Sequence, residues 1–204
     1  KMEPSWIFKI LVMGAGGIGK EAFIQRYCSS GLDEDYHKMT IGAGFHIREE
    51  VLDTGESIKM QLWDLASEKR FRELIPDYAK GTSGAIICFD LADYESFKEV
   101  SEWLEIVRKG AGFIPLILIG LNRHQENREV DYYTAREYAE NAKIIAYIEA
   151  SVKEDMNVKE SFNLMGKLMV FYSSSGPLKL SPELLTTIER VSLGWLKGAV
   201  LVNG

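Results

Sequence analysis

The chain has 204 residues, of which 46% are hydrophobic and 26% are charged. These proportions are typical of a soluble globular protein and exclude a disordered chain or a collagen-like fibre. The net charge of −6 argues against a nucleic-acid partner, because phosphate contacts require a basic surface. Only two cysteines are present and no apolar run is long enough to cross a bilayer, so we expect a cytoplasmic protein.

Apolar segments of strand length alternate along the chain with longer segments of helical period. This alternation predicts an α/β fold with a six-stranded, mostly parallel sheet and helices on both of its faces. A turn at residues 53–56 predicts that the strands on either side of it form an antiparallel hairpin. The expected strands are residues 7–13, 45–52, 57–63, 83–90, 114–120 and 143–148, and the expected helices are about 19–29, 68–80, 94–109, 134–142 and 155–171.

The composition changes after Tyr172, where serine, glycine and proline predict a flexible linker over residues 173–180. Pro182, directly after Ser181, is typical of a helix start. We therefore expect a main domain over residues 5–172 and an appended amphipathic helix, outside that domain, over 181–204. One face of this helix is expected to carry Leu184, Ile188, Val191, Trp195 and Ala199.

A glycine-rich loop follows the first expected strand and opens the first expected helix. It reads Gly14-Ala15-Gly16-Gly17-Ile18-Gly19-Lys20 and fits the phosphate-loop pattern G-x-x-x-x-G-K. The glycines let successive backbone N–H groups point at phosphate oxygens, and the lysine supplies a cation. The alternative is a glycine-rich turn without a ligand, but the position between strand and helix favours a phosphate site.

Residues 7–172 resemble a Rab-like small GTPase of the Ras superfamily. Residues 36–42 (YHKMTIG) resemble the first switch, and residues 63–71 (WDLASEKRF) stand where the family has WDTAGQERF. Residues 148–153 (IEASVK) resemble the ETSAK loop that helps to hold guanine, and residues 128–131 (REVD) are also Rab-like. The resemblance implies the P-loop NTPase (small G-protein) fold.

The resemblance also implies ligands and partners. The expected cofactors are GTP or GDP with Mg²⁺, and the expected partners are protein effectors or regulators that bind the switch surfaces at about 36–45 and 64–78. The implied metal ligands are Thr40, Asp64 and Glu21. The implied nucleotide-binding residues are Gly14, Ala15, Gly16, Gly17, Ile18, Gly19, Lys20, Glu21, Thr40, Asn122, Arg123, Ser151, Val152 and Lys153.

The chain departs from the family pattern at two places near the expected phosphates, first at Glu21 and second in the second switch, at Ser67 and Glu68. Glu21 replaces the Ser or Thr that ligates Mg²⁺, and it brings a negative charge that repels another unit charge 4 Å away by about 4 kcal/mol at an effective dielectric of 20. Ser67 replaces the glycine whose N–H contacts the γ-phosphate. Glu68 stands at the catalytic position of the water-orienting glutamine, and its charge predicts very slow or absent hydrolysis.

A third departure lies in the guanine clamp NKxD. Its equivalent is either residues 121–124 (LNRH) or, shifted by one, residues 122–125 (NRHQ). In both alignments the aspartate that accepts hydrogen bonds from guanine is missing. Losing such a partner relaxes the choice of base.

Two functions therefore remain open. The first is a nucleotide-dependent molecular switch with weakened Mg-nucleotide binding and slow hydrolysis. The second is a pseudo-GTPase, an interaction or scaffold module that does not cycle on nucleotide. The last residues, 201–204, contain no cysteine for prenylation, so we expect weak or indirect membrane association. The C-terminal helix is expected to dock on its own domain, on a partner or on a second copy, and the alternative is that it lies on a membrane surface.

Overall fold

A computed structural model describes residues 4–29, 35–38, 43–175 and 182–200, with side chains described for all of these except 35–38, 69 and 193–200. One seven-stranded sheet has the order β2-β3-β4-β1-β5-β6-β7. The strands are β1 (Trp6–Gly14), β2 (Asp35–Lys38), β3 (Ala43–Val51), β4 (Ser57–Leu65), β5 (Gly84–Asp90), β6 (Leu116–Leu121) and β7 (Ala146–Glu149). The helices are α1 (Lys20–Ser29), α2 (Lys69–Arg72), α3 (Ile75–Tyr78), α4 (Tyr94–Lys98), α5 (Val100–Ala111), α6 (Tyr132–Asn141), α7 (Val158–Ser175) and α8 (Pro182–Val200).

All six expected strands lie in the sheet, and the α/β fold is confirmed. β4, β1, β5, β6 and β7 pair in parallel, while β3 pairs antiparallel with β4 and forms the expected hairpin. The seventh strand, β2, is an addition to the prediction. Its sequence, DYHK, carries no apolar alternation, and it extends only by pairing its backbone with β3 at the edge of the sheet.

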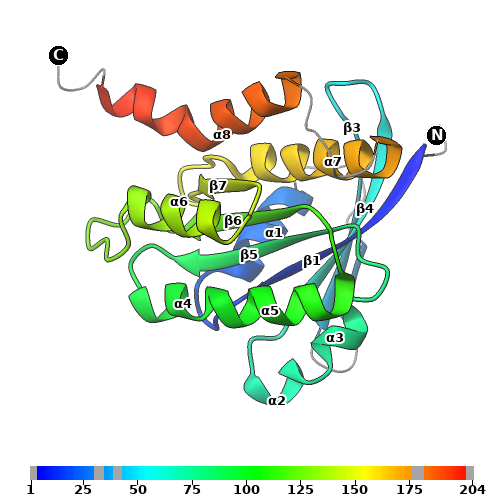
Figure 1. Cartoon of the computed structure of the whole chain (residues 1–204), viewed down its shortest axis with the longest axis horizontal. Helices are drawn as coiled ribbons and strands as arrows, with labels where there is room; N and C mark the ends of the chain where they lie inside the picture. Colours follow the sequence, from blue (N-terminus) through cyan, green and yellow to red (C-terminus); the bar gives the residue numbers. More distant parts are fainter. Residues whose placement is uncertain (1–3, 30–34, 39–42, 176–181, 201–204) are drawn as a thin grey trace.

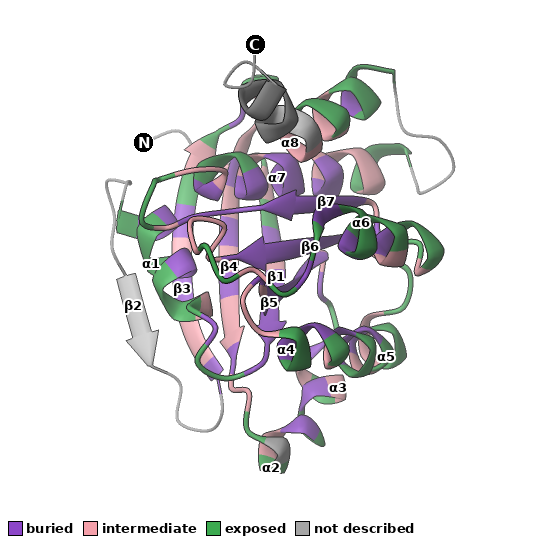
Figure 2. Cartoon of the chain, turned by 90° about the vertical axis from the view of Figure 1, so that its left-hand side faces the viewer, coloured by how far each residue is buried: buried purple, intermediate pink, exposed green. Residues whose placement is uncertain are grey.

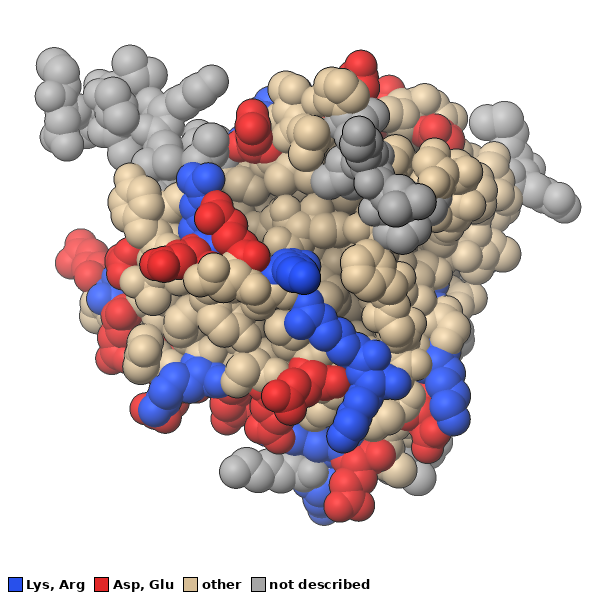
Figure 3. All heavy atoms as spheres, viewed as in Figure 1, with Lys and Arg blue, Asp and Glu red and all other residues tan. Residues whose placement is uncertain are grey.

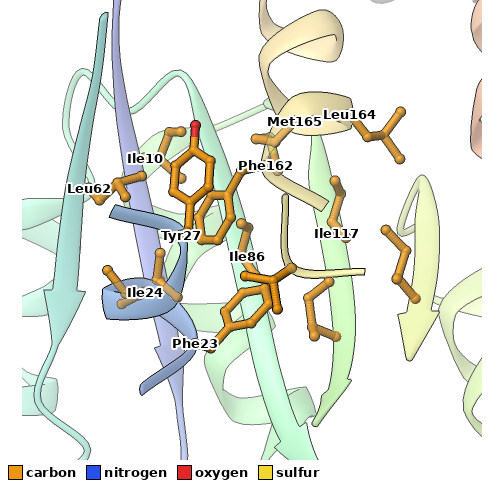
Figure 4. Close-up of a cluster of buried hydrophobic side chains, with 14 of the residues drawn as sticks. Ile10, Phe23, Ile24, Tyr27, Leu62, Ile86, Ile117, Phe162, Leu164 and Met165 are labelled. Carbon is orange, nitrogen blue, oxygen red and sulfur yellow. The ribbon is translucent and has the colours of Figure 1, made fainter. Parts of the chain in front are cut away.

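Helices cover both faces of the sheet (Figures 1 and 2). One apolar core cluster lies between the sheet and α1, α7 and α8, and a second lies between the sheet and α3 to α6. In the first cluster, Tyr27 of α1 stacks on Phe162 of α7 with ring centroids 4.0 Å apart, above the sheet residues drawn in Figure 4. In the second, Trp103 of α5 is fully buried. These two cores hold β1 and α1 in place, and the glycine-rich loop connects the end of β1 to the start of α1.

Several helix bounds differ from the prediction for local reasons. The helix expected over 68–80 is split into α2 and α3, because Pro76 lacks a backbone N–H and occupies the first turn of a new helix. The helix expected over 94–109 is likewise two helices, α4 and α5, that meet at Glu99. α7 starts later than expected because Asp155 and Asn157 have φ of 52° and 57°, which are not helical values.

The C-terminal part also differs from the prediction. Residues 173–175 continue α7, so the start expected for the linker was wrong, and residues 176–181 lie outside the described part of the chain. α8 is not separate from the main domain but packs on α7 and β7. Leu184 is 7% exposed within the first core cluster, and Ile188 and Val191 pack against that cluster. Among the described helices, none is long and apolar enough to cross a membrane.

Candidate functional site

The glycine-rich loop connects β1 to α1 and borders an open cavity of about 360 Å³. Gly17 and Gly19 have φ of 77° and 87°, a region that favours glycine, and a Cβ on Gly17 would meet nothing within 4 Å. The first backbone N–H groups of α1 have no partner within the helix and can bind an anion. The cavity is lined by residues 15–22 together with Asp64 and Ser67. This backbone arrangement fits a phosphate group.

Lys20 and Asp64 meet at this cavity, as the resemblance implies. The Lys20 ammonium forms an ion pair with the Asp64 carboxylate and donates a hydrogen bond of 3.0 Å to the Leu65 carbonyl oxygen. Burial lowers the pKa of Lys20 to about 8, and the nearby charge of Glu21 acts in the opposite direction. The cation therefore lies at the cavity, but it is already bonded to the chain.

Glu21 lies in the first turn of α1 and lines the cavity. Its carboxylate is exposed and accepts a hydrogen bond of 3.1 Å from the side chain of Gln25, one turn further along the helix. An acidic residue at this position also interacts favourably with the helix dipole. Glu21 is thus held along α1 by a local hydrogen bond.

Ser67 and Glu68 are placed differently with respect to the loop. A Cβ on Gly16 would lie 2.8 Å from the Ser67 Oγ, so this hydroxyl lies directly against the loop. Glu68 is exposed at the start of α2 and forms an ion pair of 2.7 Å with the Arg70 Nε. Glu68 is not among the residues that line the cavity. The structure therefore brings Ser67, but not Glu68, to the phosphate loop.

Asn122 connects the loop that follows β6 to the phosphate loop. Its side-chain amide donates to the Ile18 carbonyl oxygen at 3.3 Å and to the Asp90 carboxylate at 2.7 Å. Leu121, in contrast, is the last residue of β6 and is 1% exposed in the core. The alignment shifted by one therefore fits the structure, with Asn122 in the first clamp position and Gln125 in place of the aspartate.

The two loops expected around the base lie side by side. The Arg123 backbone N–H donates to the Ala150 carbonyl oxygen at 3.2 Å, and the His124 Nδ1 lies 3.1 Å from the Ser151 Oγ. Ser151 is fully buried, whereas Lys153 is exposed. The structure thus brings Arg123 next to residues 150–153, as expected for one binding region. Val152 is half-buried beside them, and Thr40 lies outside the described residues.

The ion pairs of two arginines, Arg128 and Arg72, were not identified from the sequence. Arg128 binds the Glu149 carboxylate with both Nη atoms, and Glu149 is fully buried. The Tyr147 hydroxyl donates to the same carboxylate at 2.8 Å. Arg72, in the second switch, forms ion pairs with Glu99, at the junction of α4 and α5, and with Glu102 of α5. The partners of each ion pair lie far apart in the sequence, by 27 and 30 residues for Arg72 and by 21 for Arg128. No local motif therefore predicts these pairs.

Metal ligands are few in the described part of the chain. No group of three or more His, Cys, Asp and Glu side chains there is arranged to hold a metal ion. The carboxylates that line the loop cavity are Asp64 and Glu21. The residues that fit a Mg²⁺ ion bound next to phosphate are therefore these two, of which Asp64 is paired with Lys20.

A mostly parallel sheet with a glycine-rich loop between β1 and α1 defines the fold as that of a P-loop NTPase. The family model described as "Ras family" matches residues 9–170. The chain therefore belongs to the Ras family. Within this family it is Rab-like, because its similar proteins include members with Rab and Ypt names.

Three such relatives match over most of their length. GTP-binding protein YPTM1 of Zea mays is 37% identical, with 80% of this chain and 78% of the relative covered. Ras-related protein RABD2a of Arabidopsis thaliana is also 37% identical, with 80% of each chain covered. GTP-binding protein ypt1 of Schizosaccharomyces pombe is 34% identical, with 81% of each covered.

Proposed function

We propose that this protein binds GTP or GDP with Mg²⁺ at the phosphate loop and acts as a Rab-like molecular switch, with weakened nucleotide binding and slow or negligible hydrolysis. The observation that carries the proposal is the open loop cavity, which has the Lys20–Asp64 ion pair at its border. The contacts to phosphate come mainly from backbone N–H groups, so they do not depend on the side chains that depart from the family pattern.

A guanine base is favoured by the arrangement of the two loops beyond the phosphate loop. Asn122 fixes one loop to the phosphate loop, and the His124–Ser151 contact joins it to residues 150–153. Two of the relatives are named GTP-binding proteins. With Gln125 in place of the clamp aspartate, the site would discriminate less strongly between guanine and other bases.

The residues that would hold Mg²⁺ and the residue at the hydrolytic position support weakened nucleotide binding and slow hydrolysis. A bound Mg²⁺ would neutralise phosphate charge, and Asp64 and Thr40 would hold it, with Glu21, which lines the same cavity, as a third ligand. To do so, Asp64 must separate from Lys20. Glu68 would have to leave Arg70 to approach an attacking water, and as a carboxylate it cannot donate a hydrogen bond to phosphate.

The partners would be protein effectors or regulators that bind the two switch surfaces. The described part of the second switch exposes charged side chains such as Glu68, Arg70 and Asp77 next to the half-exposed Leu74. Figure 3 shows that acidic and basic side chains are interspersed on the face in view. Mixed charges of this kind favour a protein partner chosen by local charge pairs.

Thermal unfolding with added Mg-GDP, Mg-GTP and Mg-ATP tests the proposal. A ligand at 100 times its Kd stabilises the native state by about 2.7 kcal/mol, so a guanine nucleotide should raise the Tm by several degrees. Lys20→Ala should abolish this shift, whereas Lys153→Ala, at an exposed lysine of the base loop, should reduce it only partly. The absence of a shift with every nucleotide, in protein freed of copurified ligand, would contradict the proposal.

A pseudo-GTPase is the second candidate, and one observation favours it. Lys20, the cation of the loop, is paired with Asp64 and bonded to the Leu65 carbonyl oxygen, so its charge is compensated within the chain without a ligand. Denaturing the purified protein and separating the released small molecules by chromatography distinguishes the two functions. Stoichiometric nucleotide that exchanges with added GDP supports the switch, and neither bound nor exchangeable nucleotide supports the pseudo-GTPase.

A further inference from the structure

Two open cavities flank α8 where it lies on the domain (Figure 1). One, of about 270 Å³, lies between the start of α8 and the end of α7, and the other, of about 120 Å³, lies between α8, α6 and β7. The Ser192 Oγ of α8 is buried without a hydrogen-bond partner among the described residues. A close-packed core contains few such defects. The contact is made chiefly by Leu184, Ile188 and Val191, so we expect α8 to open more readily than the strands of the sheet.

Tyr132, at the start of α6, connects α8 to β7. Its hydroxyl donates a hydrogen bond of 3.2 Å to the Ser192 carbonyl oxygen of α8. The centroid of its ring lies 5.4 Å from the centroid of the Tyr147 ring, in β7. Ile188 and Ser192 of α8 line the same cavity as these two tyrosines. Both tyrosines are 3% exposed, so their positions depend on what packs against them, and α8 is part of that packing.

Tyr147 in turn contacts both strands that lead into the two loops expected around the base, residues 122–125 and 150–153. Its hydroxyl donates a hydrogen bond of 2.8 Å to the carboxylate of Glu149, the fully buried last residue of β7. A Cβ on Gly120, near the end of β6, would lie 3.0 Å from the same hydroxyl oxygen. Burial raises the pKa of Tyr147 well above its ordinary value, so the hydroxyl stays protonated at neutral pH and donates. One buried hydroxyl therefore lies where the two loops leave the sheet.

Glu149 is bonded to the chain around both loops. Arg128 binds its carboxylate with both Nη atoms. The next residue, Ala150, accepts a hydrogen bond of 3.2 Å from the Arg123 N–H through its carbonyl oxygen. The Ala150 N–H donates to the Gly120 carbonyl oxygen at 2.8 Å. The position of Glu149 thus affects that of Ala150, which joins the two loops.

We propose that Tyr147 is a positioning residue of the nucleotide site and couples the two base loops to the docking of α8. Detachment of α8 removes the hydrogen-bond acceptor of Tyr132 and part of the packing around both rings. The Tyr147 hydroxyl is then held less firmly between Gly120 and Glu149, the base loops open more often, and nucleotide leaves faster. The coupling is reciprocal, so bound nucleotide holds α8 in place. The effect on nucleotide rests on the proposed function, whereas the coupling between α8 and the loops does not.

Amide hydrogen exchange of the full chain, freed of nucleotide, tests the coupling. The Arg123 and Ala150 N–H groups are hydrogen-bonded, so their exchange reports the opening of the loops. Tyr132→Phe removes the hydroxyl that contacts α8 and keeps the ring, and Leu184→Ala weakens the docking itself. Both should speed this exchange by about three- to tenfold, the scale of one lost hydrogen bond. Leu185→Ala, at an exposed leucine of the same helix, is the matched control and should leave the exchange unchanged.

The release of a fluorescent GDP analogue tests the effect on nucleotide. Tyr132→Phe, Leu184→Ala and Tyr147→Phe should each release it about three- to tenfold faster than the wild type. Their Kd for pyrophosphate should stay unchanged, because pyrophosphate has no base and reaches only the phosphate loop. A general loss of stability would instead weaken the binding of both ligands, so this comparison separates positioning from a merely structural role.

The outcomes separate this inference from the proposed function. Unchanged exchange of the two loop amides in Tyr132→Phe and Leu184→Ala overturns the coupling, whatever the protein binds. An equal increase at the amide of Ile87, in the buried strand β5, also overturns it, because the effect is then one of global unfolding. Faster loop exchange with unchanged GDP release overturns the positioning role of Tyr147. No binding of GDP overturns the proposed function and that role together, and the exchange measurement still decides the coupling.

Discussion

The ammonium group of Lys20, at the start of α1, forms an ion pair with the carboxylate of Asp64, near the end of β4, 44 residues further along the chain. The two side chains are 10% and 14% exposed, so water screens the pair only weakly. The expected phosphate-binding cation and the expected metal-binding carboxylate thus neutralise each other. Ligand binding at the loop must therefore replace this ion pair.

The lowered pKa of Lys20 predicts a pH dependence of nucleotide binding. Burial lowers this pKa to about 8, so above pH 8 the free protein carries a neutral Lys20 that must take up a proton to bind phosphate. By linkage, affinity should be constant below this pH and about tenfold weaker at pH 9 than at pH 7. Lys20→Arg should bind with nearly the same affinity at both pH values, since arginine stays protonated. Parallel losses in both proteins would show that another group titrates.

Glu21→Ser should strengthen Mg-nucleotide binding. The exposed carboxylate of Glu21 lines the cavity, so only part of the ~4 kcal/mol repulsion at 4 Å applies, and we expect a gain of about tenfold in affinity. Titration with Mg-GDP measures it. Glu21→Gln is the matched variant, because it removes the charge without supplying a hydroxyl ligand. Weaker binding in both variants would identify Glu21 as a metal ligand.

Most of the fold could be predicted from the sequence, because its signals are local. β5 and β6 are almost entirely apolar, and Val100, Trp103, Leu104 and Val107 recur at helical spacing on α5. β2 could not be predicted in this way, because its four polar residues are extended only by their pairing with β3. The docking of α8 depends on contacts of Leu184 with the surface of α7 and β7, and these contacts cannot be predicted from the sequence pattern of α8 alone.

In the candidate site, too, features with a local sequence motif could be predicted and features that depend on contacts between distant residues could not. The glycines and Lys20 form a continuous motif, so the loop was found directly. The choice between the two clamp alignments could not be made from the sequence, because it depends on Asn122 reaching the Ile18 carbonyl oxygen 104 residues away. The ion pairs of Arg72 with Glu99 and Glu102 were missed for a similar reason, because the partners lie 27 and 30 residues from Arg72 in the sequence.

Glu68→Gln should raise single-turnover GTP hydrolysis. The charge of Glu68 now holds it to Arg70, and an amide both weakens that pair and regains the ability to donate a hydrogen bond. We expect a gain of roughly tenfold, which corresponds to about 1.4 kcal/mol of barrier. Glu73→Gln, at another exposed carboxylate of the second switch, is the control and should leave the rate unchanged. A slower Glu68→Gln variant would show that the carboxylate acts as a base.

The docked C-terminal helix should contribute to the stability of the domain. Leu184 is 7% exposed in the first core cluster, Ile188 and Val191 pack against it, and the Tyr132 hydroxyl donates to the Ser192 carbonyl oxygen at 3.2 Å. One buried and two partly buried aliphatic side chains are worth about 3 kcal/mol or more in total. Removing residues 182–204 should therefore lower the Tm by roughly 6–12 °C.

Substitutions of Leu184 and Leu185 distinguish the docking of α8 on the domain from an effect on the stability of the helix itself. Leu184 is buried against the domain, whereas its neighbour Leu185 is 47% exposed. Leu184→Ala should cost about 2 kcal/mol or more in the free energy of unfolding, and Leu185→Ala less than about 0.5 kcal/mol. Urea unfolding measures both. Equal losses of stability in the two leucine variants would contradict docking through Leu184.

Cosedimentation with anionic liposomes should stay weak with and without α8. The described charged residues of α8 are Glu183, Glu189 and Arg190, whereas helices that lie on a membrane surface are usually richer in basic residues. Strong liposome binding that requires α8 would make the helix a membrane anchor.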